Sequence, residues 1–223
     1  MTAAPPPLYA VYGASGCGRS IMPLAREQLA RQGVPPERLV FVDDGATAPV
    51  VNGQRVLGFQ AFLQAPASTR HAVLAIADGQ VRARLAARCA AAGVQAWTVA
   101  AANVVRMDDV VLGEGAALSP FVTLTSNIRI GRHFHANLYS YVEHDCVIGD
   151  YVTFAPGVCC NGNVVIEDHA YIGTGAVIRQ GRPGAPLVIG RGAVVGMGAV
   201  VTRSVAAATT VAGNPARLLA PKE

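Results

Sequence analysis

Residues 112–178 read LGEGAALSPFVTLTSNIRIGRHFHANLYSYVEHDCVIGDYVTFAPGVCCNGNVVIEDHAYIGTGAVI. Every sixth residue of this stretch is apolar: Leu112, Leu118, Leu124, Ile130, Ala136, Val142, Ile148, Phe154, Cys160, Ile166, Ile172 and Ile178. A second set, four residues later, is small or β-branched at almost every position: Ala116, Val122, Ile128, Phe134, Ser140, Cys146, Val152, Val158, Val164, Ala170 and Ala176. An exposed strand repeats every two residues and a helix every 3.6, so neither explains this period. The pattern predicts a parallel β-helix of hexapeptide repeats, with both sets pointing inward and three hexads in each coil.

The repeat converts sequence spacing into spatial position. Residues 18 apart should stack one coil above another, about 4.8 Å apart, which is the spacing of hydrogen-bonded strands. The count stops after Ile178 and resumes at Ile189, so residues 179–188 hold five extra residues. This segment, RQGRPGAPLV, is predicted to bulge outward as a loop, either as a tolerated insertion or beside a binding face.

Composition places the protein among well-buried globular chains. Its 223 residues are 52% hydrophobic and 14% charged, which allows one or two domains. The apolar runs are too short to span a bilayer and the first residues do not form a secretory signal, so a cytoplasmic protein without a membrane partner is expected. The net charge of +4 comes from dispersed arginines, which favours small anionic ligands and no nucleic-acid partner.

The five cysteines show neither CxxC nor metal-ligand spacing. We interpret them as reduced packing residues, and two of them fall on inward positions of the repeat. The five are Cys17, Cys89, Cys146, Cys159 and Cys160.

The first hundred residues have a different pattern, that of a Rossmann-like βαβ unit. Strands are predicted at residues 8–13, 39–45, 71–78 and 95–100, and helices at 20–33 and 79–93, the second with alanine and arginine on opposing faces. Together they form a small parallel sheet covered by helices. The predicted domains are residues 1–103 and 104–223.

A glycine-rich turn follows the first predicted strand. Gly13, Gly16 and Gly18 give the spacing G-x-x-G-x-G, which differs from the dinucleotide fingerprint. Glycines here still allow close backbone approach, and a helix beginning near Arg19 would present free N–H groups to a phosphate. Asp43 and Asp44 end the next strand, where a carboxylate could bind a ribose or a base. Nucleotide binding and an ordinary strand-to-helix turn are both open interpretations.

Polar residues in the repeat concentrate around His144, between Glu143 and Asp145. A neighbouring carboxylate can fix the imidazole tautomer, as a general base requires. Gly162 follows 18 residues later and should stack on His144, with a backbone N–H suited to an oxyanion. A solvated surface histidine is the alternative.

Several motifs resemble one family. They are VYGASGCG at 11–18, FVDDG at 41–45, Asn137 with EHDC seven residues on, CCNGN one coil later, and VAGNPAR at 211–217. Over essentially its whole length the chain resembles bacterial sugar acetyltransferases with an amino-terminal nucleotide-sugar domain and a carboxy-terminal left-handed β-helix. Some of these enzymes N-acetylate nucleotide-linked 4-amino-4,6-dideoxy sugars.

The resemblance implies direct transfer from acetyl-coenzyme A, without a metal, in a homotrimer with shared sites. GDP-perosamine is the acceptor it favours. His144 would be the general base, Asp145 the acid beside it, Asn137 a nearby polar residue and Gly162 the oxyanion donor. The implied nucleotide-sugar residues are Gly13, Ser15, Gly16, Cys17, Gly18, Asp43 and Asp44. The implied coenzyme residues are Gly173, Gly175, Gly196, Gly198, Gly213, Asn214, Pro215 and Arg217.

Other functions stay open at this point. A UDP-linked amino sugar could be the acceptor, or a hydroxyl group as in the sialic-acid O-acetyltransferases. A zinc hydratase needs three histidines, and His133, His135, His144 and His169 are available, but their spacings do not obviously converge. A non-catalytic nucleotide-binding scaffold is the fourth possibility. Cys17 stands where many relatives carry histidine, and Thr153 stands where some do. A role for either side chain is therefore in doubt.

Overall fold

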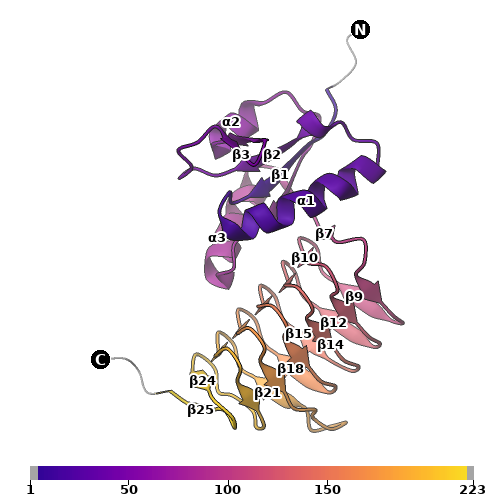
Figure 1. Ribbon diagram of the computed structural model, residues 1–223, viewed down its shortest axis with the longest axis vertical. Coiled ribbons are helices and arrows are strands. Elements are labelled where there is room, and N and C mark those ends of the chain that lie inside the picture. The colour runs from indigo at the N-terminus through magenta and orange to yellow at the C-terminus, as the bar shows by residue number, and fades with distance from the viewer. Residues whose placement is uncertain (1–4, 220–223) are drawn as a thin grey trace.

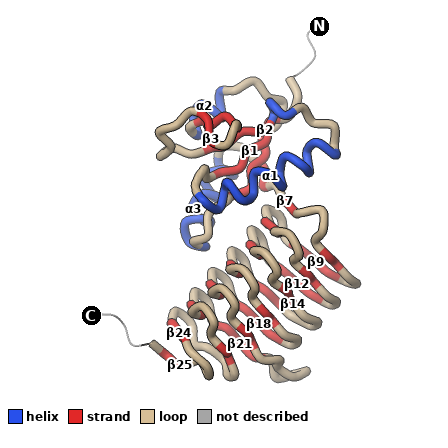
Figure 2. The backbone as a smooth tube through the Cα atoms, viewed as in Figure 1, coloured by secondary structure: helices blue, strands red, loops and turns tan. Residues whose placement is uncertain are grey.

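The computed structural model describes residues 5–219 as two stacked units. Figure 1 shows an amino-terminal unit of helices around a sheet, followed by a column of short strands wound in successive coils down to the carboxy-terminal end. Figure 2 shows that the column consists of strands and turns, whereas the helices lie in the amino-terminal unit.

The amino-terminal unit is the predicted Rossmann-like sheet. Its strand order is β3-β4-β2-β1-β5-β6, and every pairing is parallel except the β3–β4 hairpin. The strands are β1 (Leu8–Tyr12), β2 (Leu39–Val42), β3 (Val50–Val51), β4 (Gln54–Leu57), β5 (Arg70–Leu74) and β6 (Gln95–Ala96). The helices are α1 (Gly16–Arg31), α2 (Phe59–Gln64) and α3 (Gly79–Ala91), with a 3₁₀ turn, η1 (Pro36–Arg38). Helix α1 packs on one face of the sheet, and α2 and α3 pack on the other.

Two sequence-based expectations for this unit were wrong in detail, and a hairpin and a helix were missed. Helix α1 starts at Gly16 rather than near Arg19, so two of the three glycines lie in its first turn. Residues 95–100 do not form one strand, because β6 pairs with β5 while β7 (Val99–Ala100) pairs with β10 of the coiled column. The hairpin and α2 were not predicted, since their short segments have no clear periodicity.

The coiled column is a parallel β-helix with three sheets. Sheet I contains β7, β10 (Ala117–Leu118), β13 (His135–Ala136), β16 (Thr153–Phe154), β19 (Tyr171–Ile172), β22 (Val194–Val195), β24 (Thr210–Ala212) and the antiparallel β25 (Arg217–Leu218). Sheet II contains β8 (Val105–Arg106), β11 (Thr123–Leu124), β14 (Tyr141–Val142), β17 (Cys159–Cys160), β20 (Val177–Ile178) and β23 (Val200–Val201). Sheet III contains β9 (Val110–Leu112), β12 (Ile128–Ile130), β15 (Val147–Ile148), β18 (Val164–Ile166) and β21 (Leu187–Ile189).

The register confirms the spacing read from the sequence. Leu118 pairs with Ala136 and Ala136 with Phe154, a separation of 18 residues each time. Across the insertion Ile166 pairs with Ile189, and the separation is 23 because the five extra residues leave the coil. The loop is slightly shorter than predicted, since Leu187 and Val188 already belong to β21.

Both phased sets of residues point inward, as predicted. Every member is buried except Leu112, which is half-buried at the end of the repeat. Strands β7 and β8 form part of the β-helix although they precede Leu112, the first residue of the repeat. The β-helix therefore begins near Val99. The five thiols are free, and Cys146 and Cys160 lie in the helix interior as expected.

One helix does not follow its predicted pattern. Alanine and arginine were predicted on opposing faces of α3, but Arg82 is completely buried against the β-helix. None of the helices in the described residues combines the length and apolar character needed to cross a bilayer.

Candidate active site

The β-helix has three corners, and each brings together a different set of residues. Corner 1 joins sheet I to sheet II, corner 2 joins sheet II to sheet III, and corner 3 joins sheet III back to sheet I. Because each corner is a stack of turns, residues that share one lie close in space even when they lie 18 or more positions apart.

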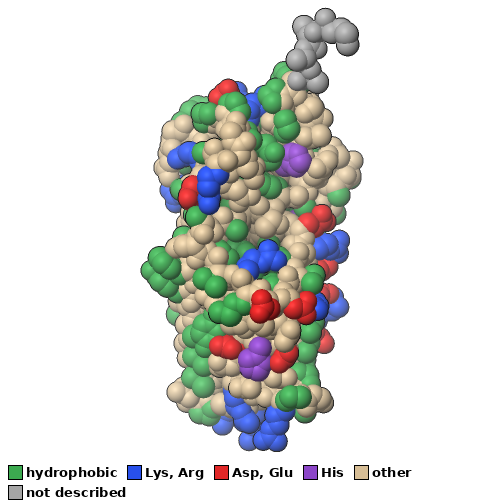
Figure 3. Space-filling view, turned by 90° about the vertical axis from the view of Figure 1, so that its right-hand side faces the viewer, with side chains coloured by type: hydrophobic (Ala, Val, Ile, Leu, Met, Phe, Trp, Pro, Cys, Tyr) green, Lys and Arg blue, Asp and Glu red, His purple; other side chains and the backbone are tan. Residues whose placement is uncertain are grey.

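His144 lies at corner 2, in the turn between β14 and β15. Its Nδ1 is 2.8 Å from Oδ2 of Asp145, and its side chain is 43% exposed. This hydrogen bond is the main reason that the pKa of His144 is raised above its usual 6.5. With Nδ1 held by a carboxylate, Nε2 is the nitrogen left to exchange a proton with a ligand. Figure 3 shows an exposed histidine flanked by acidic side chains on the face of the β-helix, with basic side chains toward its lower end.

Gly162 occupies the next turn of the same corner, directly against the His144 ring. A methyl group at residue 162 would place its Cβ 2.6 Å from Cε1 and 2.7 Å from Nε2 of His144. Only glycine therefore leaves room for the imidazole. Among the backbone hydrogen bonds of residues 5–219, none has the Gly162 N–H as donor. The histidine and this amide together form a compact unit of a base and a hydrogen-bond donor.

Residues next to this unit were not predicted. The Tyr141 hydroxyl donates to Oδ1 of Asn161 at 3.1 Å on the outside of sheet II, and burial raises the pKa of Tyr141 to about 12. The same 18-residue register that led to Gly162 could have identified Asn161, because it stacks on Glu143. The inserted loop also joins corner 2, since the Gly181 N–H donates to the Gly162 carbonyl at 2.9 Å. Three arginines of the loop and the following turn surround a hollow of about 160 Å³: Arg179, Arg182 and Arg203.

Asn137 lies on the same coil as His144 but at corner 1. Its side-chain amide donates to the Phe154 carbonyl at 2.7 Å. The glycines expected to bind coenzyme A lie in the turns stacked above it, and the turn of Gly213, Asn214 and Pro215 covers the end of that stack, followed by Arg217 in β25. In one chain, the structure thus places His144 at one corner and this set at another.

The corner 1 glycines are of two kinds. At Gly173 a Cβ would lie 2.6 Å from the backbone nitrogen of Met197, and at Gly196 it would lie 3.0 Å from the Ala212 side chain. These two allow neighbouring coils to stack closely. Gly175 and Gly198 instead have positive φ angles of 67° and 66°, with open space where a side chain would be. They leave the outer edge of the corner free for a ligand.

The expected nucleotide residues gather at the carboxyl ends of β1 and β2. Asp43 accepts hydrogen bonds from the backbone N–H groups of Ala14 at 2.8 Å and Gly45 at 2.9 Å. It lines a cavity of about 380 Å³ together with Ala14, Ser15, Gly45, Ala46, Thr47, Ala48 and Val51. Gly16 is the first residue of α1, and a Cβ added there would meet no other atom within 4 Å. A carboxylate, free helix-terminal amides and a cavity therefore lie together.

Two expected nucleotide residues point elsewhere. Asp44 accepts from the Phe59 N–H at 2.7 Å and from Arg88 at 2.6 Å, and these bonds lower its pKa. Cys17 packs against the core under α1, where burial raises its pKa. Neither residue lines the cavity beside Asp43. Gly13 and Gly18 shape the turn, because a Cβ at residue 18 would overlap the Gly13 carbonyl.

The remaining histidines do not join His144. His133 and His169 lie at corner 3, where each stacks on Tyr151 with ring centroids 5.2 Å apart. His135 is buried in β13. Within the described residues, no group of three or more His, Cys, Asp or Glu side chains is placed to hold a metal ion.

We predict that the His144 imidazole titrates above pH 6.5 and that Asp145→Asn lowers its pKa. The carboxylate stabilises the protonated ring, so without it the ring loses its proton at lower pH. NMR titration of the His144 ring resonances measures this directly. Asp109→Asn, which removes a carboxylate paired with Arg129, serves as the control. A pKa that stays constant or rises in Asp145→Asn would contradict the assigned role of this pair.

Comparison with known proteins agrees with this geometry. No family model matches the chain. Among curated proteins it is 52% identical over 210 residues to GDP-perosamine N-acetyltransferase from Escherichia coli O157:H7, covering 94% of this chain and 95% of that protein.

Solved structures give the same result. WeeI from Acinetobacter baumannii AYE superimposes with a TM-score of 0.93 at 55% identity, covering 96% of this chain and all of that one. The acetyltransferase domain of PglB from Neisseria gonorrhoeae FA1090, in complex with acetyl coenzyme A, gives a TM-score of 0.80 at 27% identity over 96% of this chain and 100% of that one. The fold, the length matched and the sequence identity agree, and the chain belongs to the left-handed β-helix acetyltransferase family that includes GDP-perosamine N-acetyltransferase.

Proposed function

We propose that this protein transfers the acetyl group of acetyl-coenzyme A to the 4-amino group of a nucleotide-linked 4-amino-4,6-dideoxy sugar, GDP-perosamine. One observation carries the proposal above all. His144, fixed by Asp145 and packed on Gly162, provides the base and the amide that acyl transfer needs. The relative that is 52% identical over 94% of the chain supports the choice of acceptor.

The proposed reaction is direct. The neutral sugar amine attacks the thioester carbonyl carbon, and Nε2 of His144 takes a proton from the nitrogen as the N–C bond forms. The carbonyl oxygen becomes an oxyanion that accepts a hydrogen bond from the Gly162 N–H. The C–S bond then breaks, and the departing coenzyme A thiolate takes the proton from His144. The products are the N-acetylated sugar nucleotide and free coenzyme A, and the base returns to its neutral form.

A homotrimer is part of this proposal. His144 lies at corner 2, whereas Asn137 and the open glycines lie at corner 1. A site that uses all of them needs corner 1 of one copy to face corner 2 of another. Around a threefold axis each copy can present both corners, so three equivalent sites form. The pantetheine arm would lie between the copies, beside Gly175 and Gly198.

We propose that nucleotide binding takes place at the cavity beside Asp43, where α1 directs its first amides toward a phosphate. The reaction would take place in the cytoplasm. The five free thiols fit a reducing compartment.

Replacing His144 tests the base. His144→Asn should fold normally but lose about 100- to 10,000-fold in kcat, the usual cost of removing a general base. Coenzyme A release, followed with a thiol reagent, measures the reaction with GDP-perosamine. Asp145→Asn should lose less kcat, because Asp145 positions the imidazole ring and does not itself take the proton. Retention of more than about a tenth of the wild-type kcat in His144→Asn would refute this mechanism.

Replacing Gly162 tests the packing around that base. Gly162→Ala should lower kcat about 100-fold, because the new Cβ displaces the imidazole from its position over residue 162. Val165→Ala, which shortens a half-buried side chain in the next strand, is the matched control. A Gly162→Ala enzyme with wild-type kcat would show that the ring does not work from this position.

Replacing Gly198 tests where the coenzyme lies. Asparagine tolerates the positive φ of this residue and puts a side chain into the open space at corner 1. Gly198→Asn should raise the KM for acetyl-coenzyme A about tenfold and leave the KM for the sugar nucleotide unchanged. Equal changes in both constants, or none, would argue against coenzyme binding along these turns.

A further inference from the structure

The guanidinium group of Arg82 connects the two units of the chain. It extends from α3 and is completely buried. Its Nε donates to the His133 carbonyl at 3.0 Å, its Nη1 to Ile76 at 2.7 Å and Ala77 at 3.1 Å, and its Nη2 to Tyr151 at 2.7 Å and Val152 at 3.1 Å. All five donor positions of the side chain are therefore used, each on a backbone carbonyl.

No carboxylate pairs with Arg82 within the described residues. Burial lowers its pKa to about 10, so the group stays charged at neutral pH. In an ion pair, the guanidinium group could contact one carboxylate in several orientations. Five carbonyls at fixed backbone positions instead determine where the guanidinium lies and how its plane is oriented.

The carbonyls on the β-helix side lie at the two ends of the coil that carries His144. His133 lies just before that coil begins, and Tyr151 and Val152 lie where it ends one turn later. His144 lies between them in the chain. Arg82 thus holds the two ends of the coil on which His144 sits.

The carbonyls on the other side belong to the loop that follows β5. Gly13, the first glycine of the proposed nucleotide turn, packs on this loop so closely that a Cβ would lie 3.0 Å from Ile76 Cδ1 and 3.0 Å from the Ala75 oxygen. Thr153 strengthens the same link, because its hydroxyl donates to the Ala77 carbonyl at 2.8 Å. A continuous path of contacts therefore runs from the nucleotide turn through Arg82 to the coil of His144.

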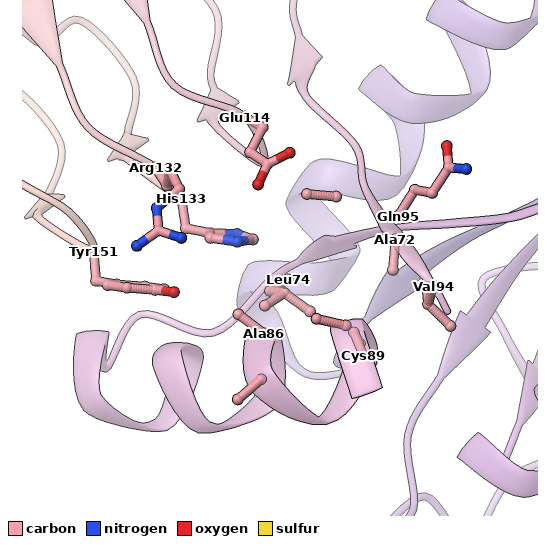
Figure 4. Close-up of a pocket in the computed structure, with 13 residues that line it drawn as sticks. Ala72, Leu74, Ala86, Cys89, Val94, Gln95, Glu114, Arg132, His133 and Tyr151 are labelled. Carbon is pink, nitrogen blue, oxygen red and sulfur yellow. The ribbon is translucent and has the colours of Figure 1, made fainter. Parts of the chain in front are cut away.

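Apolar packing between the units lies at α1, where Val99 and Ala117 of the β-helix join the core of the amino-terminal unit. It does not close the seam at α3. A cavity of about 550 Å³ lies between α3 and the coil ends, lined by His133 and Tyr151, whose carbonyls accept hydrogen bonds from Arg82. Figure 4 shows Ala86 and Cys89 of α3 on one side of the cavity and His133 and Tyr151 on the other. The Nδ1 atom of His133 is buried here without a hydrogen-bond partner. At α3, where this cavity takes the place of apolar contact, the hydrogen bonds of Arg82 and Thr153 link the two units.

We propose that Arg82 is a positioning residue that fixes the nucleotide-binding unit relative to the coil of His144, and so places the sugar amine for attack. The inference rests on the proposed acetyl transfer. It requires the nucleotide site and the acetyl site to remain intact when Arg82 is lost, while their relative placement loosens.

The test compares Arg82→Met with Arg84→Met. The control removes an exposed arginine two residues later in the same helix. Arg82→Met should lower kcat/KM for GDP-perosamine about 100-fold, since small misplacement of reacting groups has effects of that size. Calorimetry should find the affinities for GDP and for acetyl-coenzyme A within about twofold of wild type. Acetylation of the nucleotide-free 4-amino sugar should not change, because that acceptor does not use the nucleotide unit.

A purely structural role predicts a different outcome. If Arg82→Met loses GDP affinity, or loses activity on the nucleotide-free sugar to the same extent, the positioning role is overturned. Wild-type kinetics in Arg82→Met would overturn it as well. If Arg82→Met does not fold, Arg82→Lys decides: one ammonium group should keep part of the bonds and give an intermediate kcat with normal GDP affinity, and wild-type or zero turnover would count against the proposal.

Hydrogen exchange separates this inference from the proposed function. Amides in residues 75–82 and 133–152 should exchange faster in Arg82→Met than in wild type or Arg84→Met, whether or not the protein transfers acetyl groups. Absence of acetyl transfer in the wild-type protein refutes the proposed function alone. Unchanged exchange at these two segments refutes the link between them.

Discussion

The hydrogen-bonded stacking of 18-residue coils is the constraint on which the rest of this molecule depends. Each coil must return to the same place beneath the next, so inward positions recur every six residues and stay apolar. Extra residues can only leave the coil at a turn, as residues 179–186 do at corner 2. Since the strands are only two or three residues long, the turns hold most of the 18 residues of each coil. The candidate chemistry is accordingly found in the turns.

Stacking also explains how much of the site could be predicted. The position of Gly162 beside His144 follows from the register alone, because backbone spacing places residues 18 apart in contact whatever their side chains. The same logic gave the three sheets and the outward loop. Asp43 and Asp44 could not be told apart in this way. They are adjacent in the sequence, and which of them faces the cavity depends on Arg88 and on the start of α2, neither of which a local pattern reveals.

Arg82 shows the limit of periodicity more clearly. An arginine among alanines in a helix is normally a solvent-facing residue, and the pattern of α3 gives no sign that Arg82 is buried. Three of the five acceptors that make its burial possible are backbone carbonyls about fifty to seventy residues away, which have no signature in the side-chain sequence. Sequence patterns identify apolar cores reliably, but they do not show where a polar group finds its partners in the folded chain.

The candidate site is divided between two corners of the β-helix, with His144 at corner 2 and the open glycines at corner 1. A corner is a rigid stack of turns, so neither the base at corner 2 nor the open glycines at corner 1 can move far to meet a partner in the same chain. In the proposed homotrimer, substrate geometry would come from rigid-body relations between copies and between units, rather than from flexible loops. The hydrogen bonds of Arg82 can fix the relative orientation of the two units. Apolar surfaces can slide over one another with little loss of contact, whereas five directed hydrogen bonds from one planar group are satisfied together in a narrow range of orientations.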